Sequence, residues 1–144
     1  MIDRVARNEF AELLRHFVAG QIENFDFENR VPSSNDPAIN EIWWIAAWPM
    51  YDDFRTHKLE GKWRIPEEYR REIAKAILFL KSDHEYIWPK KTGFSNTLKS
   101  ILNFFTKGRS VNEQYLLDEN AWPFARMEDL DLANKDQPYL NGNS

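Results

Sequence analysis

The sequence predicts an all-α fold, with about five to six helices in a single compact domain over residues 1–133 and a polar C-terminal tail over residues 134–144. Three observations favour this class. Apolar residues recur at spacings of three and four in several segments, as on one face of a helix. Residues that start and stop helices flank those segments. No segment alternates polar and apolar residues over the length that a sheet needs.

The clearest helical pattern lies at the centre of the chain. Pro66 suits the first position of a helix because its missing N–H would have no partner there. Glu67 and Glu68 then place negative charge where the helix dipole favours it. Because Pro89 cannot continue the pattern, we expect a core helix followed by an aromatic turn. The apolar face of this helix consists of Tyr69, Ile73, Ala76, Ile77 and Leu80.

The N-terminal segment 3–19 is expected to form the first helix. Its apolar residues make one stripe, and charged residues such as Arg7 surround it. Gly20 suits the left-handed backbone conformation just past the helix end. A short turn over residues 25–30 follows, with Asn24 as its cap. The stripe consists of Ala6, Phe10, Leu13, Leu14, Phe17 and Val18.

A second strong start signal is formed by Asp36 as the cap and Pro37 as the first helical residue. Pro49 interrupts the helix that follows. Since an internal proline removes a hydrogen bond and clashes with the preceding turn, we expect a kink or break over Ala46–Pro49. The expected apolar face consists of Ile39, Ile42, Trp43, Ala46, Met50 and Phe54.

The C-terminal third carries weaker patterns. A short apolar stripe runs from Leu98 to Phe105, and Trp122-Pro123-Phe124 precedes a short helix expected over Ala125–Ala133. Three of the six tryptophans precede proline, as Trp122 does. Aromatic rings pack well on pyrrolidine rings, so these tryptophans are expected to fill the core where helices end.

The composition bounds the class of protein. An apolar share of 42% over 144 residues is that of a folded domain. The chain has no cysteine, which excludes disulfides, thiolate metal sites and cysteine nucleophiles. The first ten residues carry charges where a signal peptide would need an apolar run. The longest apolar window, Ile42–Met50, is too short to span a bilayer. We therefore expect a soluble cytoplasmic protein.

The net charge of the chain is −4, and its basic and acidic residues are grouped in separate segments. The segment Lys90–Arg109 interleaves lysines with phenylalanines and has no acidic residue, which makes it the best candidate for a polyanion or membrane surface. Since five positive charges are few and the rest of the chain is acidic, nucleic-acid binding is not expected as the main role. We favour a helix that shows its lysines to solvent. The last segment, residues 113–144, is rich in acids.

Motifs that carry chemistry are missing from the sequence. It has no glycine-rich phosphate loop, no Gly-x-Ser-x-Gly turn and no His-Glu-x-x-His. His16 has no acid at a metal-pair spacing, and neighbouring residues such as Asp83-His84-Glu85 rarely converge on one ion. Asp52-Asp53 with His57 is a weak candidate for a metal or acid–base pair. We expect no catalytic residue, no cofactor and no metal site.

Several stretches of the chain resemble a family of small uncharacterised bacterial proteins. They are Leu59-Glu60-Gly61-Lys62 through Ile77–Asp83, then Glu85-Tyr86-x-Trp88-Pro89, and Trp122-Pro123-Phe124. This resemblance implies no activity and no catalytic residue. By type alone, a small acidic helical protein also resembles immunity proteins, which bind and block a toxin encoded beside them.

The leading hypothesis is a non-enzymatic protein-binding module, most concretely an immunity protein that covers the active site of a basic, nuclease-type toxin. It rests on a compact helical domain without a catalytic set, an acidic surface and surplus aromatic residues. Electrostatic complementarity would speed association with a basic partner. The acids expected to bind the partner are Glu113, Asp118, Glu119, Glu128, Asp129 and Asp131.

Two alternatives belong to other classes. An enzyme or small-ligand binder built around Trp88, Trp122 and His84 would have a deep pocket joining these residues, with a carboxyl or imidazole of shifted pKa inside it. A self-associating structural protein would expose a large apolar patch. The sequence does not choose the partner or the oligomeric state.

Overall fold

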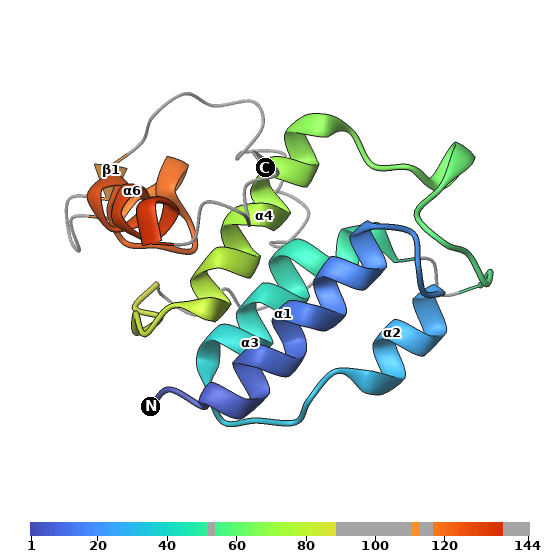
Figure 1. The fold of residues 1–144 in the computed structure, drawn as a ribbon, viewed down its shortest axis with the longest axis horizontal. Coiled ribbons are helices and arrows are strands. Elements are labelled where there is room, and N and C mark those ends of the chain that lie inside the picture. The colour runs from blue at the N-terminus through green and yellow to red at the C-terminus, as the bar shows by residue number, and fades with distance from the viewer. Residues whose placement is uncertain (52–53, 89–110, 113–116, 137–144) are drawn as a thin grey trace.

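The computed structural model describes residues 1–51, 54–88, 111–112 and 117–136 (Figure 1). This part of the chain is mostly helical, which confirms the predicted all-α class. The predicted stripe Leu98–Phe105 and the basic segment Lys90–Arg109 lie outside the described residues. The α-helices are α1 (Arg4–Val18), α2 (Asn24–Arg30), α3 (Pro37–Ile42), α4 (Glu67–Lys81) and α6 (Met127–Asp136).

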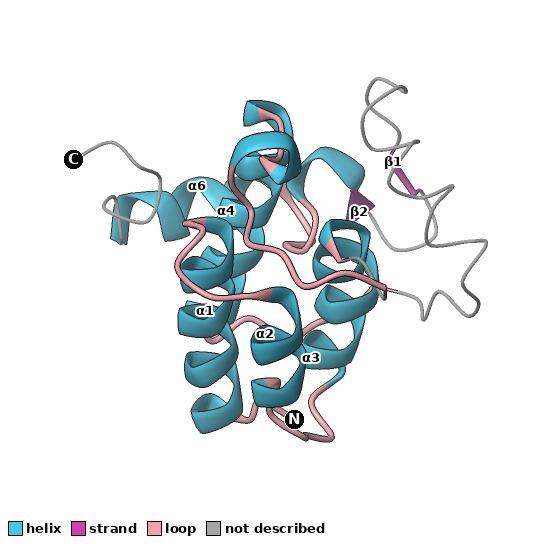
Figure 2. Cartoon of the chain, turned by 90° about the vertical axis from the view of Figure 1, so that its right-hand side faces the viewer, coloured by secondary structure: helices cyan, strands magenta, loops and turns pink. Residues whose placement is uncertain are grey.

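Helices α1 and α4 form the centre of the fold and run antiparallel. The start of α1 lies beside the end of α4. There the Arg4 guanidinium donates to the carbonyl oxygens of Leu80 and Ser82. The Asp3 carboxylate caps α1 by accepting from the Ala6 N–H, and Gly20 follows the helix with a φ of 73°. The expected first helix is thereby confirmed. Figure 2 shows α1, α2 and α3 side by side, with α4 and α6 behind them.

The expected break near Pro49 is confirmed. Asp36 caps α3 as predicted, and its carboxylate accepts from the Ala38 N–H. The helix then widens into a π-helical turn, η1 (Trp43–Ala47), and tightens into a 3₁₀ turn, η2 (Trp48–Met50). Because Pro49 has no N–H to continue the α-helical ladder, the chain changes its turn size and leaves the helix at Met50. The predicted apolar face therefore does not reach Phe54, which is 93% exposed.

Helix α4 buries the whole predicted apolar face and two further residues, Leu78 and Phe79. The buried face is wider than expected because α1, η1 and α6 all contact α4. The sequence predicts Pro66 as the first helical residue, but in the structure Pro66 is the cap before the helix and Glu67 is its first residue. The Pro66 backbone is extended and its carbonyl accepts from the Arg70 N–H.

Asn24 does not act as a cap, contrary to the sequence prediction, but is the first residue of α2. Its buried side chain instead holds the loop that follows η2. The Asn24 amide donates to the Arg55 carbonyl over 2.9 Å, and its oxygen accepts from the His57 N–H over 2.9 Å. The loop continues through a 3₁₀ turn, η3 (Gly61–Trp63), to α4.

The C-terminal part differs from the sequence prediction in two places. Two-residue strands, β1 (Val111–Asn112) and β2 (Leu117–Asp118), pair antiparallel with Val111 opposite Asp118. After a 3₁₀ turn, η4 (Glu119–Ala121), helix α6 begins at Met127 instead of Ala125 and continues to Asp136. The residues 134–136 are therefore helical, although the sequence suggested that they begin a loose tail.

An ion pair lies within the core. The Arg7 Nε donates to Asp36 Oδ2 over 2.6 Å, and neither side chain is exposed to solvent. Arg7 also donates to the His84 carbonyl over 2.7 Å and lies over the Phe79 ring. The sequence pattern predicts that Arg7 lies with the charged residues around the apolar stripe of α1. This prediction is wrong, because Arg7 is buried. The pair joins α1, the start of α3 and the turn after α4.

Candidate functional site

The outer face of helix α6 combines exposed apolar and acidic side chains. Leu130 and Ala133 point into the core, where α6 packs on α4. The opposite side carries Met127, which is 39% exposed, and Leu132, which is 58% exposed. Side chains four apart lie together on a helix, so two exposed acids accompany them. We call this set, Met127, Glu128, Asp131 and Leu132, the α6 outer face.

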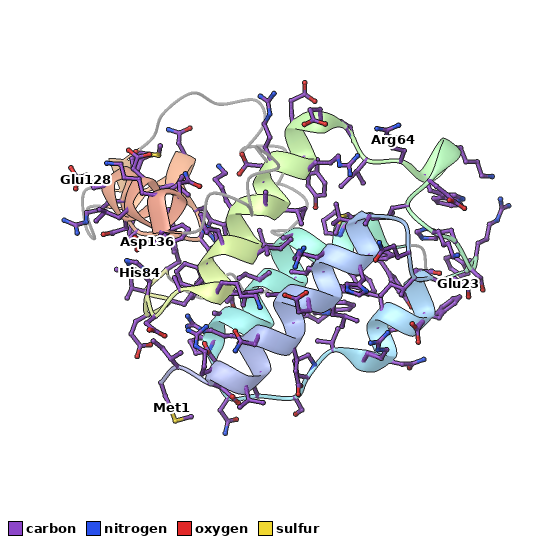
Figure 3. All side chains as sticks on the ribbon, in the orientation of Figure 1. Met1, Glu23, Arg64, His84, Glu128 and Asp136 are labelled. Atoms are coloured by element: carbon purple, nitrogen blue, oxygen red, sulfur yellow. The ribbon has the colours of Figure 1, made fainter. Side chains whose placement is uncertain are left out.

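The α6 outer face lies at one end of the molecule. In Figure 3, Glu128 and Asp136 lie at the same end as His84, whereas Glu23 and Arg64 lie at the opposite end. Figure 1 shows α6 beyond α4, with α2 on the far side of α1. A partner could therefore cover α6 without approaching α2.

One of the predicted acids on α6 is used within the fold. Both Asp129 carboxylate oxygens accept hydrogen bonds from the Arg126 guanidinium, over 3.2 Å each, and the Asp129 side chain is only 15% exposed. These hydrogen bonds from Arg126 raise the pKa of that guanidinium and keep it charged. The His84 Nε2 lies 3.8 Å from Asp129 Oδ1. Asp129 therefore anchors the start of α6.

Glu128 and Asp131 differ from Asp129 in being free to meet a partner. The Glu128 side chain is 80% exposed, and its oxygen lies 3.7 Å from Arg126 Nη1, so the two groups interact only weakly. Asp131 is exposed and makes no ion pair or hydrogen bond through its side chain with any residue the structure describes. These two acids give α6 a negative surface.

Two further predicted acids lie beside the start of α6. The Asp118 N–H donates to the Ala125 carbonyl over 2.9 Å, which holds η4 against the beginning of the helix. The Asp118 carboxylate caps η4 by accepting from the Asn120 N–H over 2.9 Å, and Glu119 is half-buried. The fold thus brings five of the six predicted acids to one region. The sixth, Glu113, lies outside the described residues.

The tryptophans of the alternative small-ligand site are buried and hydrogen-bonded. The Trp88 Nε1 donates to the carbonyl oxygens of Pro123 and Phe124, over 3.2 Å each. The Trp122 Nε1 donates to the Tyr86 hydroxyl over 3.2 Å. Burial raises the pKa of Tyr86, so its hydroxyl stays protonated. These indoles pack where the turn after α4 meets the segment before α6, which is what a structural role requires.

His84 lies at the edge of this aromatic cluster. Its ring meets the Phe124 ring edge-on, with centroids 5.3 Å apart. The Nδ1 atom is buried and has no hydrogen-bond partner among the described residues. Of the cavities lined by residues that the structure describes, one lies between α1 and α4 and one beside α2 and α3, and neither of these two is lined by His84, Trp88 or Trp122.

The histidines considered as metal ligands are separated from one another. His57 is buried and its ring stacks on Trp63 with centroids 4.2 Å apart. Its predicted partners Asp52 and Asp53 lie outside the described residues. His16 is exposed near the end of α1. In the part of the chain that the structure covers, no three metal-binding side chains gather at one point.

An aromatic surface around η1 was missed by the sequence analysis. Trp48 packs on both Trp44 and Tyr51, with ring centroids 5.4 and 5.3 Å away, and Trp44 is 40% exposed. The pattern of apolar residues suggested only that this region belongs to the core. The signal that could have found the surface is the Trp43-Trp44 doublet, since neighbouring residues of a helix point in different directions and only one of them can lie at the centre of a single buried face.

The chain matches no protein-family model, no curated protein and no solved structure. Among the described residues, no helix is both long enough and apolar enough to traverse a lipid bilayer. A function must therefore be inferred from the surfaces of the molecule.

Proposed function

We propose that this protein is a non-enzymatic protein-binding module, an immunity protein that neutralises a cognate toxin of the nuclease type by covering its basic active site. The observation that carries the proposal is the α6 outer face. Exposed apolar side chains on both sides of two acids that the fold does not use are a composition that suits a binding surface.

The charge of the surface indicates the class of partner. A nuclease binds a polyanion, so its active site carries lysines and arginines. Glu128 and Asp131 would meet these cations, and Met127 and Leu132 would exclude water from the contact. Asp118 and Glu119 extend the negative region beside the start of α6. Long-range attraction between the two surfaces would also speed their association.

The hydrogen bonding of the buried aromatic residues further supports a binding role over an enzymatic one. Trp88 and Trp122 donate their indole N–H groups to other parts of the fold. A small-ligand site built on these residues would have to break those contacts.

Capture followed by inhibition tests the proposal. The tagged protein is incubated with lysate of its source organism, and proteins that elute with salt are identified and purified. We expect one basic partner that cleaves nucleic acid and loses this activity when one equivalent of the present protein is added. A partner whose activity is unaffected at saturating binding would overturn the immunity role. Turnover of a small molecule by the protein alone would overturn the non-enzymatic role.

A further inference from the structure

A groove of about 650 Å³ lies between the C-terminal end of α1 and the first part of α4. Because the two helices run antiparallel, the end of α1 and the start of α4 lie together at the same end of the molecule (Figure 1). None of the residues lining the groove belongs to α6 or to η4. The groove is therefore a second surface, separate from the α6 outer face.

The walls of the groove carry positive charge. Arg15, Arg70 and Arg71 line it, together with His16, against a single acid, Glu67. The Arg15 guanidinium is already hydrogen-bonded to Glu12, over 3.0 Å. The guanidinium groups of Arg70 and Arg71 have no hydrogen bond or ion pair with any described residue. An incoming anion would thus find two neighbouring guanidinium groups without a carboxylate partner.

Most of the other arginines that the structure describes pair with a carboxylate, although the exposed Arg64 does not. Arg4 bonds to Asp83, Arg7 to Asp36, Arg30 to Asp26 and Arg126 to Asp129. In an acidic chain, a carboxylate is available to most surface arginines. Arg70 and Arg71 lie on α4 one turn after Glu67 and Glu68, yet no side-chain contact joins them to these acids. The groove lining therefore carries an excess of positive charge, with three arginines against Glu67.

The rest of the lining is apolar. Val18 and Ala19 contribute from the end of α1, and Ile73, Ala74 and Ile77 contribute from α4. A ligand with a charged head and an apolar body would place its head between the guanidinium groups and its body along these side chains. Guanidinium groups bind carboxylate and phosphate oxygens through paired, charge-assisted hydrogen bonds.

The size and charge of the surroundings favour a small ligand over a macromolecule. A volume of about 650 Å³ lies within the range of small-molecule sites in proteins. An acidic protein partner would be repelled by the remaining surface of a chain with a net charge of −4, whereas a small anion meets only the local cations. We infer that the groove binds a small organic anion, with a carboxylate or phosphate head held by Arg70 and Arg71 and an apolar body along Val18, Ala19 and Ala74, the apolar lining residues that solvent reaches.

Titration with simple probes tests this inference. Octanoate and octyl phosphate carry the two possible heads on the same apolar body, octanol lacks the charge, and inorganic phosphate lacks the apolar body. Each probe is titrated into the ¹⁵N-labelled protein, and amide shifts are followed by NMR. We expect octanoate, octyl phosphate or both to shift amides of the groove, and octanol and inorganic phosphate to bind at least about tenfold more weakly.

Two variants locate the site. The double variant Arg70→Gln, Arg71→Gln should weaken binding of the charged probe about tenfold or more, since it removes the charge-assisted hydrogen bonds. The matched control, Arg30→Gln with Lys62→Gln, removes the same charge from exposed residues outside the groove and should bind as the wild type does. Ala74→Phe keeps both arginines but places a bulky ring on the apolar wall of the groove, and it should also weaken binding of the octyl probes. Thermal unfolding verifies that each variant is folded.

Several results would overturn the inference. These are octanol binding as tight as that of octanoate, amide shifts that map outside the groove, and wild-type binding by the arginine variant. Binding of poly-glutamate without binding of either octyl anion would also contradict it, because it would assign the groove to an acidic macromolecule. None of these experiments involves α6, so their failure leaves the proposed function untouched.

Discussion

Two arginine–aspartate pairs in this molecule have the same chemistry and different tasks. Arg7 and Asp36 are fully buried and lie 2.6 Å apart. Arg126 and Asp129 lie 3.2 Å apart, and the Arg126 side chain is 58% exposed. The first pair joins three elements across the core, whereas the second joins neighbouring residues at the start of α6. The difference shows that environment, and not residue type, decides whether a charged pair is enclosed in the core or stays in contact with water.

The energetics of the two pairs follow from burial. Removing one member of a buried pair leaves the other charge without water and without a partner, which costs several kcal/mol. Removing Arg126 from the second pair leaves Asp129 in partial contact with water, so the change is smaller. The comparison can therefore be tested by breaking each pair in turn.

The largest effect is expected for Arg7→Met. The substitution leaves the Asp36 carboxylate buried and also removes the hydrogen bond to the His84 carbonyl. We expect the free energy of unfolding to fall by about 3–5 kcal/mol. Urea denaturation measures this change. A loss below about 1 kcal/mol would show that the buried pair does not hold the three elements together.

Acidification should weaken the same pair. Burial alone would raise the pKa of Asp36, but hydrogen bonds from Arg7 and from the N–H groups of Asp3 and Ala38 together lower it below the ordinary value of 3.8. Asp36 therefore contributes stability that is present above about pH 4 and is lost as the pH falls through the folded-state pKa. A hydrogen bond from the Ala6 N–H lowers the pKa of Asp3, and a hydrogen bond from Lys81 lowers the pKa of Glu12.

A ¹³C NMR titration of the aspartate carboxyl groups, together with urea midpoints from pH 6 to pH 2.5, checks this prediction. Stability should decline below about pH 4. If Asp36 titrated at or above 3.8 in the folded protein, the predicted contribution of this group would be wrong.

A much smaller effect is expected for Arg126→Met. Asp129 stays partly exposed and can bind water in place of the guanidinium, so we expect a loss of about 0–1 kcal/mol in urea denaturation. Comparison with Arg7→Met uses the same replacement in both environments. Equal losses in the two variants would remove the distinction between the two pairs.

Local patterns in the sequence predict much of the fold. The cap at Asp36, the break at Pro49 and the buried face of α4 each depend on neighbouring residues, and all three agree with the structure. The partner of Arg7 lies 29 residues away, so no local pattern could identify it. Phe54 was assigned to a buried face because the apolar spacing continued after the helix had already ended.

In the candidate site, too, the sequence does not reveal which side chains contact one another. The block of C-terminal acids identified α6 as a negative element, but composition could not separate Asp129, which Arg126 holds, from the exposed Asp131. The groove between α1 and α4 was not foreseen, because its lining comes from segments about 50 residues apart that only the antiparallel packing brings together.

The central claim is that the α6 outer face serves binding and not folding. The most direct test compares the double variant Glu128→Lys, Asp131→Lys with the matched control Glu23→Lys, Glu60→Lys. The control reverses two exposed acids outside α6, and Glu23 lies at the other end of the molecule (Figure 3). Affinity for the captured partner and the free energy of unfolding are measured for both.

The account predicts that the α6 variant binds the partner about tenfold or more weakly. Its stability should fall by no more than about 1 kcal/mol, because Glu128 lies in the first turn of the helix and only weakly pairs with Arg126. The control should bind as the wild type does. Unchanged affinity of the α6 variant, or an equal loss in the control, would contradict the assignment of the binding surface to α6.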